Sequence, residues 1–416
     1  MTIESNRKEN IVVTLLLFLT LAILSSNIAG YHGDIGCWRA WSTNILDNGL
    51  GSTYQTHTDY MPFYQYVMFL FAKLAGSAEN IDKHLGAIRV FTMCFDFAGI
   101  YLIYRWTSDR LGYLFVLLFT ALNIGYMYNT LLWNQVDGIV ATLFFASLFF
   151  VQNKEVLWSS VFLILTLNMK LQALSLAPVW GLLVLYQIVS SRRWWLFLLI
   201  PLVMAATQFL ILLFFGIAGA HRVWEIVTEV VGANPLITQS ADNFWNLLLG
   251  NLKAYGPDTD VWAGLTIRQW GLLFFFSTSF FALLPMLQML YLKIVGRLKA
   301  TEIPKEMVWL SAALVALLFF FCNTEMHERY CHPAFIFIAA YSLYSRRYWP
   351  YILFSIGYFL NLEWVLKFFK LNNYETVLFD QRFVALFFAA TLVLLFLDLY
   401  KSRRKFFLEE KKVSVL

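Results

Sequence analysis

Long apolar runs separated by short polar clusters make up most of the chain. A helix of about 20 apolar residues crosses a hydrocarbon core of roughly 30 Å, and most of the runs approach this length. Stretches such as Phe144 to Phe150 are apolar on every face, whereas the strands of a membrane β-barrel alternate polar and apolar residues. The pattern therefore predicts an all-α, polytopic integral membrane protein with about twelve transmembrane helices. We place these helices at roughly 11–29, 85–104, 112–131, 137–152, 156–170, 173–190, 195–217, 269–292, 306–322, 333–345, 349–366 and 383–400.

Basic residues indicate the orientation of the chain. Lys and Arg stay preferentially in cytoplasmic loops, and the short basic clusters fall on alternate loops. These clusters include Arg192–Arg193, Lys293–Lys299, Arg346–Arg347 and Lys401–Lys405. The orientation requires residues 61–75 to lie on the outer surface as an interfacial helix. Their length is short for a span, and tyrosines such as Tyr64 and Tyr66 are typical of the headgroup level.

This orientation leaves two long segments, 30–84 and 218–268, on the outer face and a basic tail, 401–416, in the cytoplasm. Of the 416 residues, 60% are hydrophobic and 14% are charged. Ordinary soluble domains do not have this balance. The formal net charge of +5 is spread over many loops and gives no sign of nucleic-acid binding. We expect one membrane domain, 1–416, with its function on the outer face.

The first outer segment carries two carboxylates. Asp34 follows the first span, and Asp59 precedes the interfacial helix. Between them, residues 35–47 are expected to form a short helix with Trp38 and Trp41 on one face, an edge suited to the headgroup zone. Each carboxylate has a structural alternative, because an acid just before a helix often caps it.

Three further segments place polar residues at the outer ends of spans. They contain Gln135 and Asp137, then Lys170, then the Met-His-Glu-Arg-Tyr run with His327, Glu328, Arg329 and Tyr330. An ion network that anchors the late span is the alternative interpretation of this run. Lys170 also has a structural alternative, since a lysine near a span end can extend to the headgroups.

Together and in this order, these motifs resemble the C-type (GT-C) membrane glycosyltransferases, which use polyprenyl-phosphate sugars. The Asp-Tyr-Met-Pro sequence at Asp59 is similar to the family's Asp-Tyr-Pro-Pro, with Met61 as a departure. The run at His327 looks like that of bacterial and archaeal relatives of the glycosylphosphatidylinositol mannosyltransferases. The resemblance covers residues 30–333. It implies a GT-C-like fold with interfacial helices in the first outer segment and an inverting transferase with an extracytoplasmic active site. The membrane would be a bacterial inner membrane or an archaeal plasma membrane.

Transfer from a lipid phosphate needs a base that takes the proton of the acceptor hydroxyl. Asp34 is the candidate base, and Asp59 is the second candidate catalytic residue. The departing phosphate is anionic, and a fixed cation stabilises it strongly at low dielectric. Arg329 fits this role best because its planar fork can bind two oxygens, with Lys170 and His327 as secondary candidates. Further substrate contacts are expected from Gln135, Asp137, Glu328, Tyr330 and Trp38.

The predicted function is therefore transfer of a hexose, with mannose as a candidate, from a polyprenyl-phosphate donor to a hydroxyl of a lipid-linked or cell-surface glycan. Two alternatives stay open: a transporter or flippase of lipid-linked sugars, and a glycan ligase or polymerase. The pattern demands no cofactor. Two His-x-Asp pairs, His32 with Asp34 and His57 with Asp59, leave a divalent metal as a further alternative.

Overall fold

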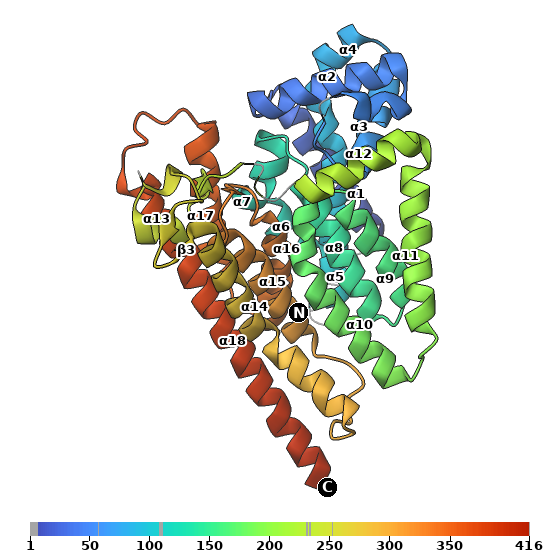
Figure 1. The fold of residues 1–416 in the computed structure, drawn as a ribbon, viewed down its shortest axis with the longest axis vertical. Coiled ribbons are helices and arrows are strands. Elements are labelled where there is room, and N and C mark those ends of the chain that lie inside the picture. The colour runs from blue at the N-terminus through green and yellow to red at the C-terminus, as the bar shows by residue number, and fades with distance from the viewer. Residues whose placement is uncertain are drawn as a thin grey trace.

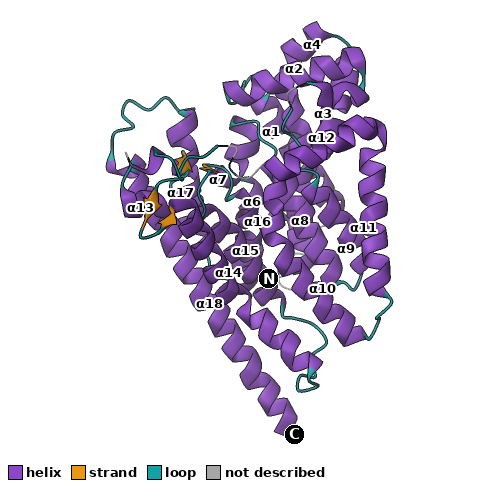
Figure 2. Ribbon diagram, in the orientation of Figure 1, coloured by secondary structure: helices purple, strands orange, loops and turns teal. Residues whose placement is uncertain are grey.

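The computed structural model of the chain describes residues 7–56, 58–107, 111–229, 232, 234–251 and 253–415. Its regular structure is almost entirely helical, as predicted, and Figure 2 shows how few strands interrupt the helices. The first α-helices are α1 (Arg7–Ser25), α2 (His32–Asn48), α3 (Pro62–Ala75), α4 (Ala78–His84), α5 (Arg89–Thr107), α6 (Tyr113–Ala121), α7 (Ile124–Met127), α8 (Asp137–Gln152), α9 (Val156–Leu167), α10 (Ala177–Ser191) and α11 (Leu196–Leu212). The later ones are α12 (Gly216–Glu229), α13 (Phe244–Leu249), α14 (Ile267–Ile294), α15 (Lys305–Cys322), α16 (His332–Ser345), α17 (Trp349–Leu366) and α18 (Gln381–Val415).

Short helical turns and strands connect these helices. The turns are η1 (Leu50–Gln55), η2 (Leu85–Ile88), η3 (Tyr128–Leu132), η4 (Leu171–Leu176), η5 (Leu213–Phe215), η6 (Lys253–Tyr255) and η7 (Val377–Phe379), and η3 is a π-helix. The strands are β1 (Thr238–Gln239), β2 (Val261–Trp262), β3 (Leu265–Thr266) and β4 (Met326–His327). The second outer segment is therefore not a plain loop, because it contains α12, α13 and three of the strands.

Several helices are long and apolar enough to cross a membrane. Within the described residues there are seven such stretches: Arg7–Ser25, Ala78–Thr107, Leu171–Ser191, Leu196–Glu229, Ile267–Ile294, Lys305–Cys322 and Gln381–Glu410. A bent pair of helices forms an eighth if it is counted as one span. The chain is thus a multi-pass membrane protein, and the count of twelve spans stays a prediction.

The predicted span 112–131 is not one straight helix, which corrects the sequence prediction. The helix α6 and the segment Ile124–Leu132 meet at an angle of 64°. Asn123 lies at the break, where its side chain accepts a hydrogen bond from the backbone N–H of Tyr126 and donates one to Ser355. Asparagine is a favoured N-cap residue, so it stabilises the new helix start. The π-helical turn η3 then buries Asn129 completely.

A group of helices from the two long outer segments lies at one end of the molecule. Figure 1 shows α2, α3 and α4 at the end opposite the C-terminus, with α12 lying just below them. We call this the outer end. The predicted interfacial helix is α3, which has 14 residues and is not one of the stretches able to span. The connections that carry Arg192–Arg193 and Lys293–Lys299 lie at the opposite end (Figure 1), in agreement with the predicted orientation.

The tryptophan edge of the first outer helix does not face the headgroups, contrary to the prediction. Trp38 and Trp41 are 1% and 7% exposed. Trp38 packs against Tyr64 and Trp41 against Tyr60, with ring centroids 5.6 and 5.5 Å apart. Buried aromatic pairs of this kind contribute strongly to packing. These rings therefore attach α2 to α3 and the residues just before it.

The strands β1 and β4 join the second outer segment to the Met-His-Glu-Arg-Tyr run. They pair in parallel, with Thr238 opposite Met326 and Gln239 opposite His327. The run itself follows α15, the most buried of the seven candidate spans. The run is therefore held between a buried helix and the second outer segment.

Candidate functional site

Asp34 lies in the first turn of α2 and does not cap that helix. The helix begins at His32, and its N-cap is Tyr31, which makes no side-chain capping bond, so the capping alternative for Asp34 is wrong. Gln135 Nε2 donates a hydrogen bond of 2.5 Å to Asp34 Oδ2, and Trp133 Nε1 donates one of 3.3 Å to the same atom. The other carboxylate oxygen, Oδ1, has no hydrogen-bond donor within the described part of the chain. The turn before α8 thus orients the carboxylate and leaves one oxygen open.

Asp137, the first residue of α8, is fully buried and holds the cations of the site. Lys170 Nζ donates to its Oδ1 at 2.5 Å, and Asn129 Nδ2 donates to its Oδ2 at 3.1 Å. Arg329 Nε lies 3.9 Å from Oδ2, which is an ion pair but too long for a hydrogen bond. Both oxygens of Asp137 are therefore occupied. This arrangement suits an anchor for cations better than a proton acceptor.

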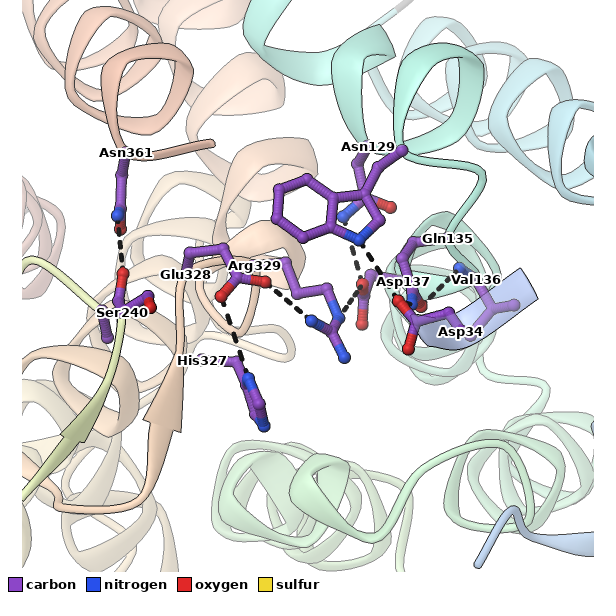
Figure 3. A network of polar contacts seen from close by, with 12 residues as sticks. Asp34, Asn129, Gln135, Val136, Asp137, Ser240, His327, Glu328, Arg329 and Asn361 are labelled. Carbon is purple, nitrogen blue, oxygen red and sulfur yellow. Dashed lines mark hydrogen bonds and ion pairs between the residues drawn. The ribbon is translucent and has the colours of Figure 1, made fainter. Parts of the chain in front are cut away.

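Arg329 lies between β4 and α16, and its neighbour in sequence orients it. Its Nη1 donates to Glu328 Oε1 at 2.7 Å. Its guanidinium carbon lies 5.9 Å from the ring centroid of Trp133 and 5.8 Å from that of Tyr330, both cation–π distances. Trp133 therefore contacts Asp34 through its N–H and Arg329 through its ring. The acid and the cation singled out in the sequence lie in one cluster (Figure 3).

Neither cation of this cluster is saturated. An ammonium carries three donors and a guanidinium five. The described residues accept one hydrogen bond from Lys170 and one from Arg329. The Nε atom of Arg329 is buried and has no hydrogen-bond partner among those residues. Unfilled donors in an enclosed place are what an anionic ligand needs.

The charges of the cluster keep one another ionised. Burial raises the pKa of Glu328, but Arg329 and His327 together with a backbone hydrogen bond lower it, and the net pKa lies below the ordinary value. Burial lowers the pKa of Arg329, but the surrounding acidic groups, with Glu328 first and Asp34 next, raise it, and the net pKa lies well above the ordinary value. His327 Nδ1 is 3.8 Å from Glu328 Oε2, so it adds an ion pair only when the imidazole is protonated.

The remaining predicted residues lie at different distances from this cluster. Tyr330 is part of it, since Lys170 Nζ is 5.7 Å from its ring centroid. Burial raises the pKa of Tyr330 to about 12, and Asp59 is among the carboxylates that add to the shift. Asp59 is exposed and does not cap α3, whose N-cap is Met61. Trp38 is buried between α2 and α3 and takes no part in the polar contacts.

A line of buried groups behind Asp137 was missed in the sequence. Asn129 Nδ2 also donates to Tyr358 Oη at 3.1 Å, and this oxygen lies 3.1 Å from His332 Nδ1. Because Tyr358 accepts from Asn129, its own proton is available for His332, which favours the neutral tautomer with the proton on Nε2. The His332 ring stacks on the ring of Tyr126, with the two centroids 5.2 Å apart. Residues of α7, η3, α16 and α17 thus form one chain of contacts, which reaches Asp137 through Asn129.

Two hollows lie near these elements. A groove of about 630 Å³ between α6 and α17 shares no residue with the polar cluster; it is lined by Phe115, Phe119, Asn123, Tyr348, Tyr351, Ile352, Ser355 and Ile356. A much smaller cavity lies beside Tyr330 and Gln172. The Nε2 atom of Gln172 is buried and has no partner within the described ranges. Gln172 is therefore a further candidate for ligand contact next to Lys170.

The metal alternative gains no support from these residues. Among the described residues, no group of three or more His, Cys, Asp or Glu side chains is arranged to hold a metal ion. His57, which one of the two His-x-Asp pairs requires, lies outside the described residues. Metal dependence therefore stays untested.

Comparison with known proteins does not assign the chain to a family. No family model matches it, and no curated protein matches it. The resemblance to the C-type glycosyltransferases therefore depends on the motifs alone, and function has to be argued from the geometry of the cluster.

Proposed function

We propose that the protein is a C-type membrane glycosyltransferase. It would transfer a hexose from a polyprenyl-phosphate donor to a hydroxyl of a lipid-linked or cell-surface glycan. One observation carries the proposal: a carboxylate with an open oxygen, Asp34, lies in one cluster with two cations that keep open donors, Lys170 and Arg329. Glycosyl transfer from a lipid phosphate needs this combination of a base and an electrostatic stabiliser.

Asp34 acts as the base in this proposal. The donors Gln135 and Trp133 both bind Oδ2, so the carboxylate is held in one orientation while Oδ1 stays available. Asp137 is not the base here, because Lys170 and Asn129 occupy its oxygens.

Arg329 and Lys170 bind the phosphate of the donor. Each cation is oriented by one carboxylate, Glu328 for Arg329 and Asp137 for Lys170, and each keeps donors for the ligand. The orientation matters because a donor that is already in place needs no reorganisation when charge develops. The carboxylates also offset the repulsion between the two cations in a buried site.

The chemical step is a single displacement. The acceptor oxygen forms a bond to the anomeric carbon while the bond from that carbon to the phosphate oxygen breaks. The electron pair of the broken bond leaves with the phosphate, and the hydroxyl proton goes to Asp34 Oδ1. A single displacement inverts the anomeric centre, as the resemblance implies.

The membrane setting favours a lipid-linked donor. The cluster is built from residues at the outer end of spans, where a phosphate at headgroup level can reach it. In this proposal the spans number twelve, because the bent pair, the shorter helices α8, α9 and α16 and the 18-residue α17 are added to the seven long stretches. Two of the shorter helices, α8 and α16, are buried on nearly all faces, so other helices surround them.

The direct test is sugar transfer by the purified protein in proteoliposomes with a synthetic polyprenyl-phosphate hexose. We expect Asp34→Asn to reduce kcat by about 10²- to 10⁴-fold, the usual contribution of a general base. The matched control is Asp47→Asn, which removes an exposed carboxylate from the same helix and should leave kcat unchanged.

The same vesicles separate the proposal from its alternatives. A labelled donor lipid that crosses the bilayer without losing its sugar would favour a transporter or flippase. Transfer from a diphosphate-linked donor with none from the monophosphate would favour a ligase or polymerase. Full activity of Asp34→Asn would remove Asp34 from the mechanism.

A further inference from the structure

The hairpin formed by β2 and β3 exposes an apolar tip at the outer end of α14. Val261, Trp262 and Leu265 are 71%, 47% and 36% exposed. The two turn residues, Ala263 and Gly264, have φ values of 48° and 86°. Two consecutive residues with positive φ are typical of a tight two-residue hairpin turn. The chain thus presents three large apolar side chains on a short, defined loop.

Ionic contacts hold the base of this hairpin rigid. Arg268 donates to both carboxylate oxygens of Asp258, at 2.8 and 2.9 Å, and lies 2.9 Å from Glu325. Thr324 donates a further hydrogen bond of 2.8 Å to Asp258. A bidentate pair between arginine and a carboxylate fixes geometry as well as distance. The hairpin is therefore firmly attached to the protein, and a loose loop does not explain why its apolar side chains are exposed.

Aromatic side chains continue from the tip into the span. Trp270 Nε1 donates to the backbone oxygen of Trp262 at 2.7 Å, and the two rings lie 5.6 Å apart. Trp270 in turn stacks on Phe274 at 5.5 Å. These contacts connect the hairpin to the first turns of α14.

The exposed apolar surface of α14 adjoins the hairpin. The helix begins at Ile267, directly after β3, and is long and apolar enough to span. Leu273, Phe276 and Phe280 on this helix are 47%, 64% and 52% exposed, as expected for a lipid-facing surface. Figure 1 places β3 on the flank of the molecule beside α13 and α14, and not among the helices at the extreme outer end.

We propose that residues 261–265 insert into the headgroup zone of the same bilayer that α14 crosses. Tryptophan is the residue most typical of that zone, and Val261 and Leu265 would reach the upper acyl chains beside it. Asp260, which is exposed at the base, limits the insertion to the interface. This inference does not depend on the proposed function, because it concerns only the hairpin and the lipid.

The insertion would fix the second outer segment at a defined depth. The ion cluster at the base joins the hairpin to Glu325, and β4 begins at the next residue. The hairpin therefore sets the height of the run that contains Arg329 above the bilayer.

A spin label on Ala263→Cys tests the insertion in nanodiscs of phosphatidylethanolamine and phosphatidylglycerol. The exposed cysteines Cys37 and Cys94 are first replaced by serine, and this parent protein measures background labelling of the buried cysteines. Glu79→Cys on α4 is the matched control, since it is exposed at the extreme outer end (Figure 1). We expect the label at 263 to collide more with oxygen than with a water-soluble nickel chelate, and the label at 79 to show the reverse.

Two outcomes would overturn the proposal. The first is a label at 263 with the same nickel accessibility as the label at 79. The second concerns a protein that carries Val261→Lys and Trp262→Lys together with the label at 263. If these lysines leave the oxygen and nickel accessibilities unchanged, the apolar side chains do not hold the tip in the lipid.

Discussion

Two arginines at the outer end are held in opposite ways. Arg268 makes three short contacts with carboxylates, two with Asp258 and one with Glu325. Arg329 makes one hydrogen bond, to Glu328, and its Nε stays 3.9 Å from Asp137. Carboxylates of the described residues thus take up three of the five N–H donors of Arg268, but only one of those of Arg329.

The difference separates a structural ion cluster from a candidate binding site. An arginine whose donors are mostly used by the protein adds little when a ligand arrives. Glu363 is a comparable structural group, since both of its oxygens accept hydrogen bonds, from the hydroxyls of Tyr128 and Tyr374 and from the backbone of Phe368 and Phe369. The number of open donors, rather than the presence of charge, is therefore our criterion for the candidate functional residues.

The strongest test of the difference between the two arginines is to replace each one by lysine. Arg329→Lys keeps the charge but loses the planar fork, and we expect kcat/KM for the donor to fall by about 10- to 100-fold. Arg268→Lys should leave kcat/KM nearly unchanged and lower the melting temperature, because it loses bidentate contacts that only support the fold. Steady-state transfer and thermal unfolding of both variants in the same detergent measure the two effects. If both variants lost the same fraction of kcat/KM, the two arginines would not differ in function.

Asp137→Asn tests whether the anchor of the cations matters. The amide loses the ion pairs with Lys170 and Arg329, so we expect KM for the donor to rise by about tenfold with a smaller change in kcat. Asp258→Asn is the matched change in the ion cluster around Arg268 and should affect stability alone. A fall in kcat for Asp137→Asn as large as that for Asp34→Asn would instead assign Asp137 a role as base.

The line of groups behind Asp137 predicts a smaller effect. Tyr358→Phe removes the hydroxyl between Asn129 and His332 but keeps the ring, and we expect roughly a threefold rise in KM for the donor. Tyr374→Phe removes a comparable hydroxyl from Glu363 and should not change KM. The pair of variants shows whether positioning of Asp137, rather than loss of a buried hydroxyl in general, causes the effect.

The smallest expected effect concerns acid stability. The folded-state pKa of Glu328 lies below the unfolded value of about 4.3, so its stabilisation is present above that value and is lost as the pH falls through the folded-state pKa. Glu328→Gln should therefore lower the melting temperature at pH 7. Between pH 7 and pH 3, the melting temperature of this variant should then fall less than that of the unaltered protein. Thermal unfolding between pH 7 and pH 3 measures this, and parallel curves for both proteins would contradict it.

Much of the fold follows from the apolar pattern. Spans such as those at α14 and α18 are long, uninterrupted and flanked by charge, so composition alone identifies them. The break at Asn123 was not predicted, because residues 112–131 are apolar on both sides of it and the capping bond depends on local geometry. The inward face of Trp38 was also missed, since a tryptophan edge suits both a headgroup zone and a packed helix.

The candidate site was predicted in part. Asp34, Asp137, Lys170 and Arg329 were all singled out by residue type and position near span ends, and the structure brings them together. Asn129 was not, because it reaches Asp137 only through the π-helical turn, and hydropathy does not reveal such a turn. Tertiary contacts between remote segments decide which polar residues meet.

The parallel pair of β1 and β4 has a consequence for engineering. Its register pairs Thr238 with Met326 and Gln239 with His327, although the two candidate spans α14 and α15 separate these strands in the sequence. A chimera that exchanges residues 230–266 for those of another protein would present a foreign strand to β4. Grafts intended to change acceptor choice should therefore exchange both strands together, as one unit.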